Sequence, residues 1–98
     1  MEIKMTKDND KLLVALEGRL DTMTSPELEE KLKPELDSLT ELTFDFSGLE
    51  YISSAGLRVL LMAAQSMEGK GKMVVKNVNS DIMDIFEVTG FSDILNIE

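Results

Sequence analysis

Two adjacent hydroxyl side chains, Ser53 and Ser54, stand where a loop sequence passes into an apolar-periodic helix. The first N–H groups of a helix have no partner within it and lie at its positive end, so they stabilise an anion by roughly 0.3–1 kcal/mol. A phosphate on a serine at this junction would leave the fold intact and change what can dock there. The alternative is that these serines only cap the helix.

Catalysis is disfavoured by composition, because a serine nucleophile needs a base within reach and the chain has no histidine and no cysteine. The lysines that could replace it are expected to be exposed: Lys70, Lys72 and Lys76. Asp45 is expected inside its strand, which does not suit an aspartyl-phosphate receiver. No Gly-rich loop supports nucleotide binding. We therefore expect no enzyme, no cofactor and no metal site.

The composition is that of one folded domain spanning residues 1–98, with 43% hydrophobic and 30% charged residues. Nineteen acidic against ten basic side chains give a net charge of −9, which repels nucleic acid and anionic membranes. No run approaches the roughly 20 apolar residues of a membrane span, and the N-terminus lacks the apolar core of a signal peptide. We expect a cytoplasmic protein that binds neither nucleic acid nor membrane.

The chain is expected to open as a β-hairpin. Ile3 and Met5 alternate with polar neighbours as an edge strand does, and residues 7–10 form a polar turn. Residues 12–16 are apolar on both faces, which predicts a central strand covered on two sides and ended by Gly18.

A first helix should begin at Ser25 as N-cap, followed by proline at N1, or at Thr24 in a capping box with Glu27. Pro34 predicts a kink or an early end near Lys33. The helix has a narrow apolar stripe, which is formed by Leu28, Leu32, Leu36 and Leu39.

In the second half, periodicity predicts a strand over 41–46 and a loop over 47–53. A second helix follows, with apolar residues at helical spacing from Leu57 to Met67 and a stop at residues 69–71. A short buried strand at 73–75 and a third helix ending at Gly90 come next. Asn79 or Ser80 should cap the third helix, and residues 91–97 form a turn and a last extended or helical piece. Alternating strands and helices predict right-handed crossovers and a mainly parallel sheet.

Residues 45–61 resemble the signature of the STAS domain, as found in bacterial anti-sigma factor antagonists. Residues 17–21 look like the second motif of the family, and 72–77 followed by 82–90 look like its closing strand and helix. The resemblance spans the whole chain. It implies a single STAS-like α/β domain with a mixed, mainly parallel sheet of four to five strands and three to four helices, largely on one side.

The resemblance also implies a phosphoacceptor, because Ser54 aligns with the serine two residues before the motif glycine, Gly56, that cognate kinases modify. Asp21 falls at the end of a strand just before the first helix, where the crossover topology should bring it near the Ser54 loop. It aligns with an aspartate used at the partner interface or to position the serine; on local sequence alone it is equally an Asx-type turn residue. The family motif Asp-Ser-Ser/Thr-Gly is here Ser53-Ser54-Ala55-Gly56, so no carboxylate precedes the acceptor.

Arg58, one turn into the helix, either pairs with a carboxylate of a partner or only solvates the surface. Among the methionines, Met62 and Met67 are expected in the core, whereas Met23 is expected to be an exposed contact. The expected partner-binding residues are Asp21, Met23, Ser53, Ser54, Gly56, Leu57 and Arg58.

The implied function is a phosphorylation-gated binding module. In this interpretation the unmodified form binds a serine/threonine-kinase-type anti-sigma factor and frees its client, and a PP2C-like phosphatase resets the switch. The chain is expected to be a monomer or weak dimer. The alternative is a STAS scaffold or subunit of a larger assembly, in which Ser54 is only a cap.

Overall fold

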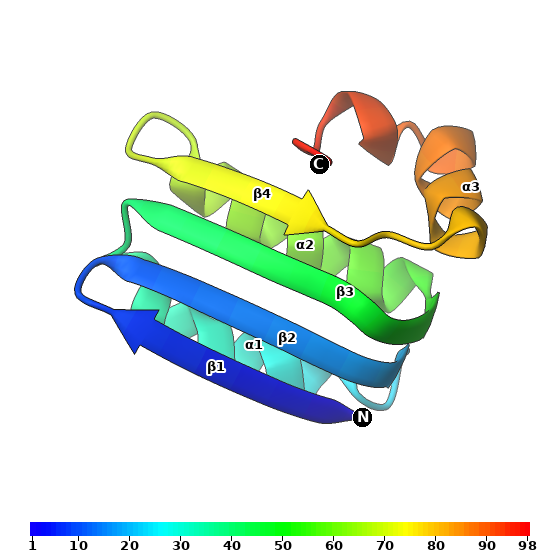
Figure 1. Cartoon of the computed structure of the whole chain (residues 1–98), viewed down its shortest axis with the longest axis horizontal. Coiled ribbons are helices and arrows are strands. Elements are labelled where there is room, and N and C mark those ends of the chain that lie inside the picture. Colours follow the sequence, from blue (N-terminus) through cyan, green and yellow to red (C-terminus); the bar gives the residue numbers. More distant parts are fainter.

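The computed structural model describes all 98 residues, which form a four-stranded mixed sheet with three α-helices and one short 3₁₀-helix (Figure 1). The elements are β1 (Glu2–Asp8), β2 (Lys11–Leu20), α1 (Ser25–Leu36), β3 (Glu41–Ile52), α2 (Ser54–Met67), β4 (Lys72–Lys76), α3 (Ser80–Thr89) and η1 (Phe91–Asp93). The spatial order is β1-β2-β3-β4, with β1 antiparallel to β2 and the other pairs parallel. The predicted α/β class and the initial hairpin are confirmed.

Helices α1 and α2 cover one face of the sheet, and α3 lies beyond the β4 side (Figure 1). The hydrophobic core fills the space between that face and the two helices. Alternate residues of β2 and β3 enter it, together with the leucine stripe predicted for α1: Leu12, Val14, Leu16, Leu42, Phe44, Phe46, Leu28, Leu32, Leu36 and Leu39. Burial of each such side chain stabilises the fold by about 1.5–3 kcal/mol, so the core holds both helices firmly on the sheet.

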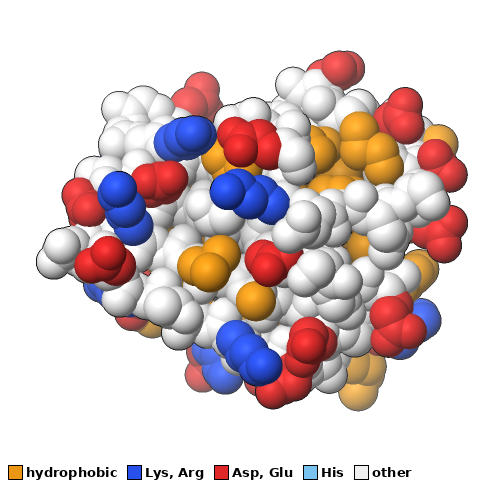
Figure 2. All heavy atoms as spheres, in the orientation of Figure 1, with side chains coloured by type: hydrophobic (Ala, Val, Ile, Leu, Met, Phe, Trp, Pro, Cys, Tyr) orange, Lys and Arg blue, Asp and Glu red, His pale blue; other side chains and the backbone are white.

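The opposite face of the sheet carries no helix. Both parallel connections run in the same direction across the sheet, and right-handed crossovers then place both helices on one side. Leu13 of β2 is consequently 41% exposed. Figure 2 shows acidic and basic side chains interspersed over this face. The strand is central, as predicted, but the prediction that it is covered on two sides is wrong.

Strands β2 and β3 are longer than the sequence pattern predicts. Gly18, with φ of 101°, lies within β2 and does not end it, and most of the expected loop 47–53 belongs to β3. Two register shifts accommodate extra residues of β3 and bend the pair. A Cβ on Gly48 would lie 2.7 Å from the Glu17 Cγ and 3.2 Å from the Leu16 carbonyl oxygen, so the close approach of the strands requires glycine there.

Helix α1 departs from its prediction at both ends. It begins at Ser25, whose Oγ donates to the carbonyl oxygen of Asp21, and Thr24 at the N-cap position makes no side-chain cap. The predicted early end near Lys33 is wrong, because the helix continues through Pro34 to Leu36. Pro34 removes a single hydrogen bond near the helix end, whereas burial of Leu36 favours the last turn.

The predictions for the third helix and for the last residues of the chain are confirmed. Asn79 caps α3 by accepting from the N–H of Ile82 at 2.8 Å, and Gly90 ends it with φ of 84°. The C-terminal piece is extended at Ile97, which forms a parallel bridge with Val75 along the edge of β4. None of the helices is long and apolar enough to cross a membrane.

Candidate phosphorylation and docking site

The carboxyl ends of β2 and β3 lie side by side, so the segments that follow them meet at one end of the sheet. Leu20 pairs with Ile52, and the N–H of Ser53 donates to the carbonyl oxygen of Leu20 at 2.9 Å. Asp21 and Ser53 therefore leave their strands as neighbours. The prediction that the crossover topology brings Asp21 to the Ser54 loop is confirmed.

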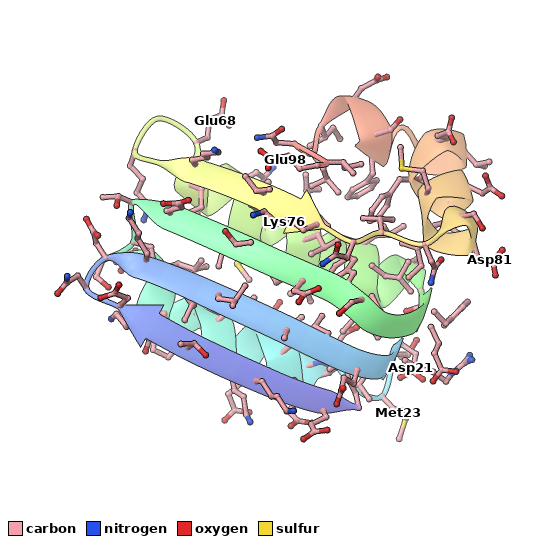
Figure 3. The ribbon with its side chains drawn as sticks, viewed as in Figure 1. Asp21, Met23, Glu68, Lys76, Asp81 and Glu98 are labelled. Atoms are coloured by element: carbon pink, nitrogen blue, oxygen red, sulfur yellow. The ribbon has the colours of Figure 1, made fainter.

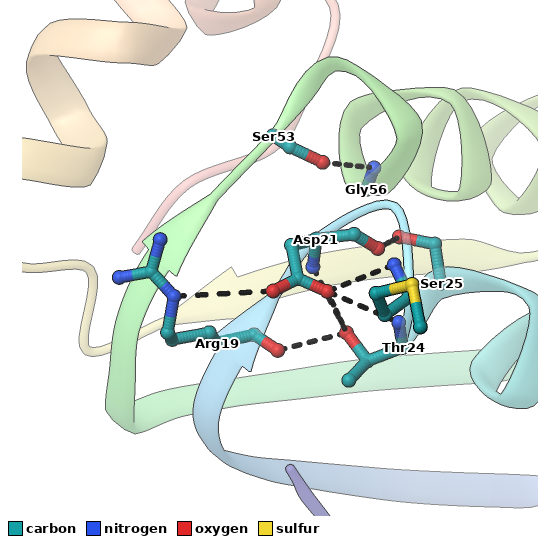
Figure 4. A network of polar contacts seen from close by, with 7 residues as sticks. Arg19, Asp21, Thr24, Ser25, Ser53 and Gly56 are labelled. Atoms are coloured by element: carbon teal, nitrogen blue, oxygen red, sulfur yellow. Dashed lines mark hydrogen bonds and ion pairs between the residues drawn. The ribbon is translucent and has the colours of Figure 1, made fainter.

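Ser53 and Ser54 have different environments at the start of α2. Ser53 has extended backbone angles, and its Oγ accepts from the N–H of Gly56 at 3.4 Å as an N-cap (Figure 4). Ser54 is the first residue of the helix; its side chain is exposed and makes no hydrogen bond within the chain. One hydroxyl is thus committed to the helix start and the next is available to an enzyme or a partner.

Asp21 organises the turn between β2 and α1. Its Oδ1 accepts from the N–H groups of Met23 at 3.0 Å and Thr24 at 3.1 Å, which confirms the Asx-type turn (Figure 4). These hydrogen bonds, that from Thr24 above all, hold the pKa of the Asp21 carboxyl below its usual range. The site therefore presents a fixed negative charge at neutral pH.

Arg19 and Tyr51 form a contact that the sequence reading missed. The Arg19 guanidinium lies 4.3 Å from the centre of the Tyr51 ring, and its Nε is 3.9 Å from Oδ2 of Asp21. The two residues pair across β2 and β3, but only because of the second register shift. No signal in the sequence indicated it, because the pattern ends the two strands before Arg19 and before Tyr51.

Met23 is 87% exposed, as predicted. It lies with Asp21 at the end of the molecule that also holds Asp81, in the first turn of α3, whereas Glu68 lies at the opposite end (Figure 3). Arg58 is also exposed. It lines a shallow groove of about 240 Å³ between α1 and α2, together with Thr22, Ser25, Pro26, Glu29, Ala55 and Val59. The exposed Arg58 thus lies one helical turn from Ser54, and the exposed Met23 lies in the turn that Asp21 organises.

Gly56 and Leu57 are buried beneath this surface. A Cβ on Gly56 would lie 2.8 Å from side-chain carbons of both Ile52 and Leu20 and 2.9 Å from the Leu20 carbonyl oxygen. The motif glycine therefore lets α2 start directly against the strands. Contact of Gly56 and Leu57 with a partner stays a prediction.

Outside this end of the sheet the molecule offers little site chemistry. Asp45 is a half-buried polar strand residue, as predicted, and its Oδ1 accepts from the Asn77 side chain at 2.9 Å and from the Ser47 N–H at 3.0 Å. The lysines considered as bases are exposed: Lys70, Lys72 and Lys76. The structure brings together no group of three or more side chains that could hold a metal ion.

The fold and this site define a small α/β domain with an exposed serine at a capped helix start. A family model described as "Mlab, STAS domain" matches residues 3–96. The chain therefore belongs to the STAS-domain family.

Named relatives agree with this assignment. BtrV of Bordetella bronchiseptica, provisionally named an anti-sigma factor antagonist, is 30% identical over 99 residues, which cover 99% of this chain and 85% of BtrV. The anti-sigma-B factor antagonist of Listeria monocytogenes is 29% identical over 100 residues, covering 100% of this chain and 87% of the relative. The Bacillus cell fate determinant SpoIIAA, solved in its phosphorylated form, has the same fold with a TM-score of 0.79 at 16% identity, over 99% and 91% of the two chains.

Proposed function

We propose that this chain is a phosphorylation-gated protein-binding module of the anti-sigma factor antagonist type. The unmodified form docks a serine/threonine-kinase-type anti-sigma factor, or a related switch protein, through the Ser54 turn, the half-buried Asp21 and the exposed side chains of Met23 and Arg58. Docking frees the other client of the kinase. A phosphate on Ser54 prevents docking, a PP2C-like phosphatase removes it, and the exchange takes place in the cytoplasm.

The proposal rests on one observation, which is that Ser53 caps α2 whereas Ser54 is exposed and makes no side-chain hydrogen bond. Ser53 satisfies the helix start, so a phosphate on the exposed Ser54 disturbs no hydrogen bond of the fold. The names of BtrV and of the Listeria relative support the same class of function. The role proposed here is binding and not catalysis, since the turn contains no general base beside Ser54.

The charge of a phosphate is sufficient for such a switch. Phosphorylation adds about −1.5 to −2 charges at pH 7. If docking covers this group without a matching cation, desolvation costs several kcal/mol. A loss of about 3 kcal/mol weakens binding more than roughly 100-fold.

The test is to incubate the protein with a candidate kinase and Mg-ATP, to locate the phosphate by peptide mass spectrometry, and to measure partner binding by calorimetry. Ser54→Ala should abolish phosphorylation and keep binding, and authentic phosphoprotein should bind at least 100-fold more weakly. The matched control is Ser53→Gly, since glycine at an N-cap costs only a few tenths of a kcal/mol; it should still be phosphorylated at position 54.

Phosphate on another residue, or equal partner affinity of the phosphorylated and unmodified forms, would contradict the switch. Stable incorporation into a larger particle without any phosphorylation would instead favour the scaffold function.

A further inference from the structure

The chain has two arginines, Arg19 and Arg58, and they differ in how they are engaged. The Arg19 guanidinium is stacked on Tyr51 and its Nε faces Oδ2 of Asp21. Arg58 is exposed and takes part in none of the ion pairs of the chain. Arg58, unlike Arg19, is therefore without an anion.

Arg58 lies one helical turn after Ser54, at i+4, and both side chains are exposed. Residues at this spacing face each other on a helix, with Cβ atoms about 5–6 Å apart. Side chains also lean toward the helix N-terminus, which directs Arg58 back toward position 54. A guanidinium presents a fork of N–H donors that matches two phosphate oxygens.

Competing charges around Arg58 are few. The carboxylate of Glu29, across the groove on α1, is paired with Lys33 at 3.6 Å. Asp21, at the end of β2, faces Arg19, and the first turn of α2 has no acidic residue. A phosphate on Ser54 would therefore place an anion on α2 itself, one turn before Arg58.

We infer that Arg58 is the internal counter-ion of phosphorylated Ser54, and that the modification thereby withdraws Arg58 from the partner. This inference rests on the proposed function. The same guanidinium serves two alternative anions: a carboxylate of the partner when Ser54 is unmodified, and the phosphate of its own chain afterwards. Phosphorylation then both adds a charge that the partner must exclude and removes a cation that the partner used.

The test uses the full chain with phosphoserine incorporated at position 54 during translation, so that it needs no kinase. The second pKa of the phosphate, about 6 when unperturbed, is followed by ³¹P NMR. A nearby cation lowers the pKa of an acid. At this exposed site we expect the second phosphate pKa to be about half a unit lower in the wild type than in Arg58→Gln, which is about threefold in proton affinity. In the matched control, Arg19→Gln, the phosphate should titrate as in the wild type. In Arg58→Lys, part of the lowering of the phosphate pKa should remain.

A second readout is the Nε–H signal of Arg58, since the chain has only two arginine Nε–H signals to assign. On phosphorylation the Arg58 signal should shift and exchange more slowly with water, while that of Arg19 stays in place. Identical phosphate titration in the wild type and in Arg58→Gln, or a shift lost only in Arg19→Gln, would overturn the inference. Failure of a kinase to modify Ser54 would contradict the proposed function but not the role of Arg58 as counter-ion.

Discussion

Replacement of Gly56 by alanine tests whether the close approach of α2 to the strands is required. The added Cβ would lie 2.8 Å from carbons of Leu20 and Ile52, although carbon atoms pack best at about 3.5–4.0 Å. The two side chains can rotate away, but the Leu20 carbonyl oxygen, at 2.9 Å from the Cβ, accepts the N–H of Ser53 and can move only by weakening that hydrogen bond.

Overpacking of this kind costs about 1–3 kcal/mol, and the higher helix propensity of alanine offsets up to about 1 kcal/mol. We therefore expect Gly56→Ala to lower the free energy of unfolding by about 1–2 kcal/mol, equivalent to a Tm lower by roughly 4–16 °C. Urea denaturation measures the loss, and hydrogen exchange should show faster opening at the Ser53 amide. Ser54→Ala, in the same turn but exposed, should change stability by less than about 0.5 kcal/mol.

An unfolding free energy of Gly56→Ala within about 0.5 kcal/mol of the wild type would refute the reasoning. It would mean that α2 can move away from β2 at little cost and that the first turn is not held in place by the glycine.

Further predictions concern charge, proline and exposed side chains. The amide of Asn77 holds the pKa of Asp45 below its usual value. The Asp45 carboxylate therefore stabilises the fold above its unfolded pKa of about 3.9, and this stabilisation is lost as pH falls through the folded pKa. Asp45→Ala should therefore cost about 1 kcal/mol near pH 7 and progressively less below about pH 4 in urea titrations; a constant difference would contradict this. Pro34→Ala should raise the free energy of unfolding by about 1 kcal/mol, since it restores a hydrogen bond near the end of α1, and an unchanged or lower value in thermal denaturation would count against that account. Met23→Ala should leave stability within about 0.5 kcal/mol and weaken partner binding in calorimetry, whereas Val88→Ala, equally exposed on α3, should affect neither; equal effects of the two would argue against the Ser54 end as the docking surface.

Local signals in the sequence were sufficient for much of the site. The helix caps, the glycine stop at Gly90 and the leucine stripe of α1 depend on residues within one or two helical turns. The structure has the stop and the stripe as predicted, and the caps are Ser53 and Asn79, one from each pair that the sequence offered. The neighbouring positions of Asp21 and Ser53 followed from the crossover topology.

What could not be predicted depends on contacts between distant segments. The sequence pattern predicts a loop over residues 47–53, but pairing with β2 keeps residues 47–52 in the strand. The contact between Arg19 and Tyr51 arises from a register shift that no local pattern encodes. The exposure of Leu13 depends on which face of the sheet the helices α1 and α2 occupy. The helix α1 tolerates Pro34 because Leu36, in its last turn, is buried.

The spatial order of the strands is also their order along the chain, and this bears on how the domain assembles during synthesis. Each new strand is added beside the one made before it, so no strand is inserted between two that are already paired. The β1-β2 hairpin can form first, α1 then covers it as β3 pairs, and α2 and β4 follow in turn. Only the last residues, at Ile97, return to protect the edge of β4. Besides the outer edge of β1, the nascent chain therefore exposes only the edge of its newest strand, which limits mispairing with other chains.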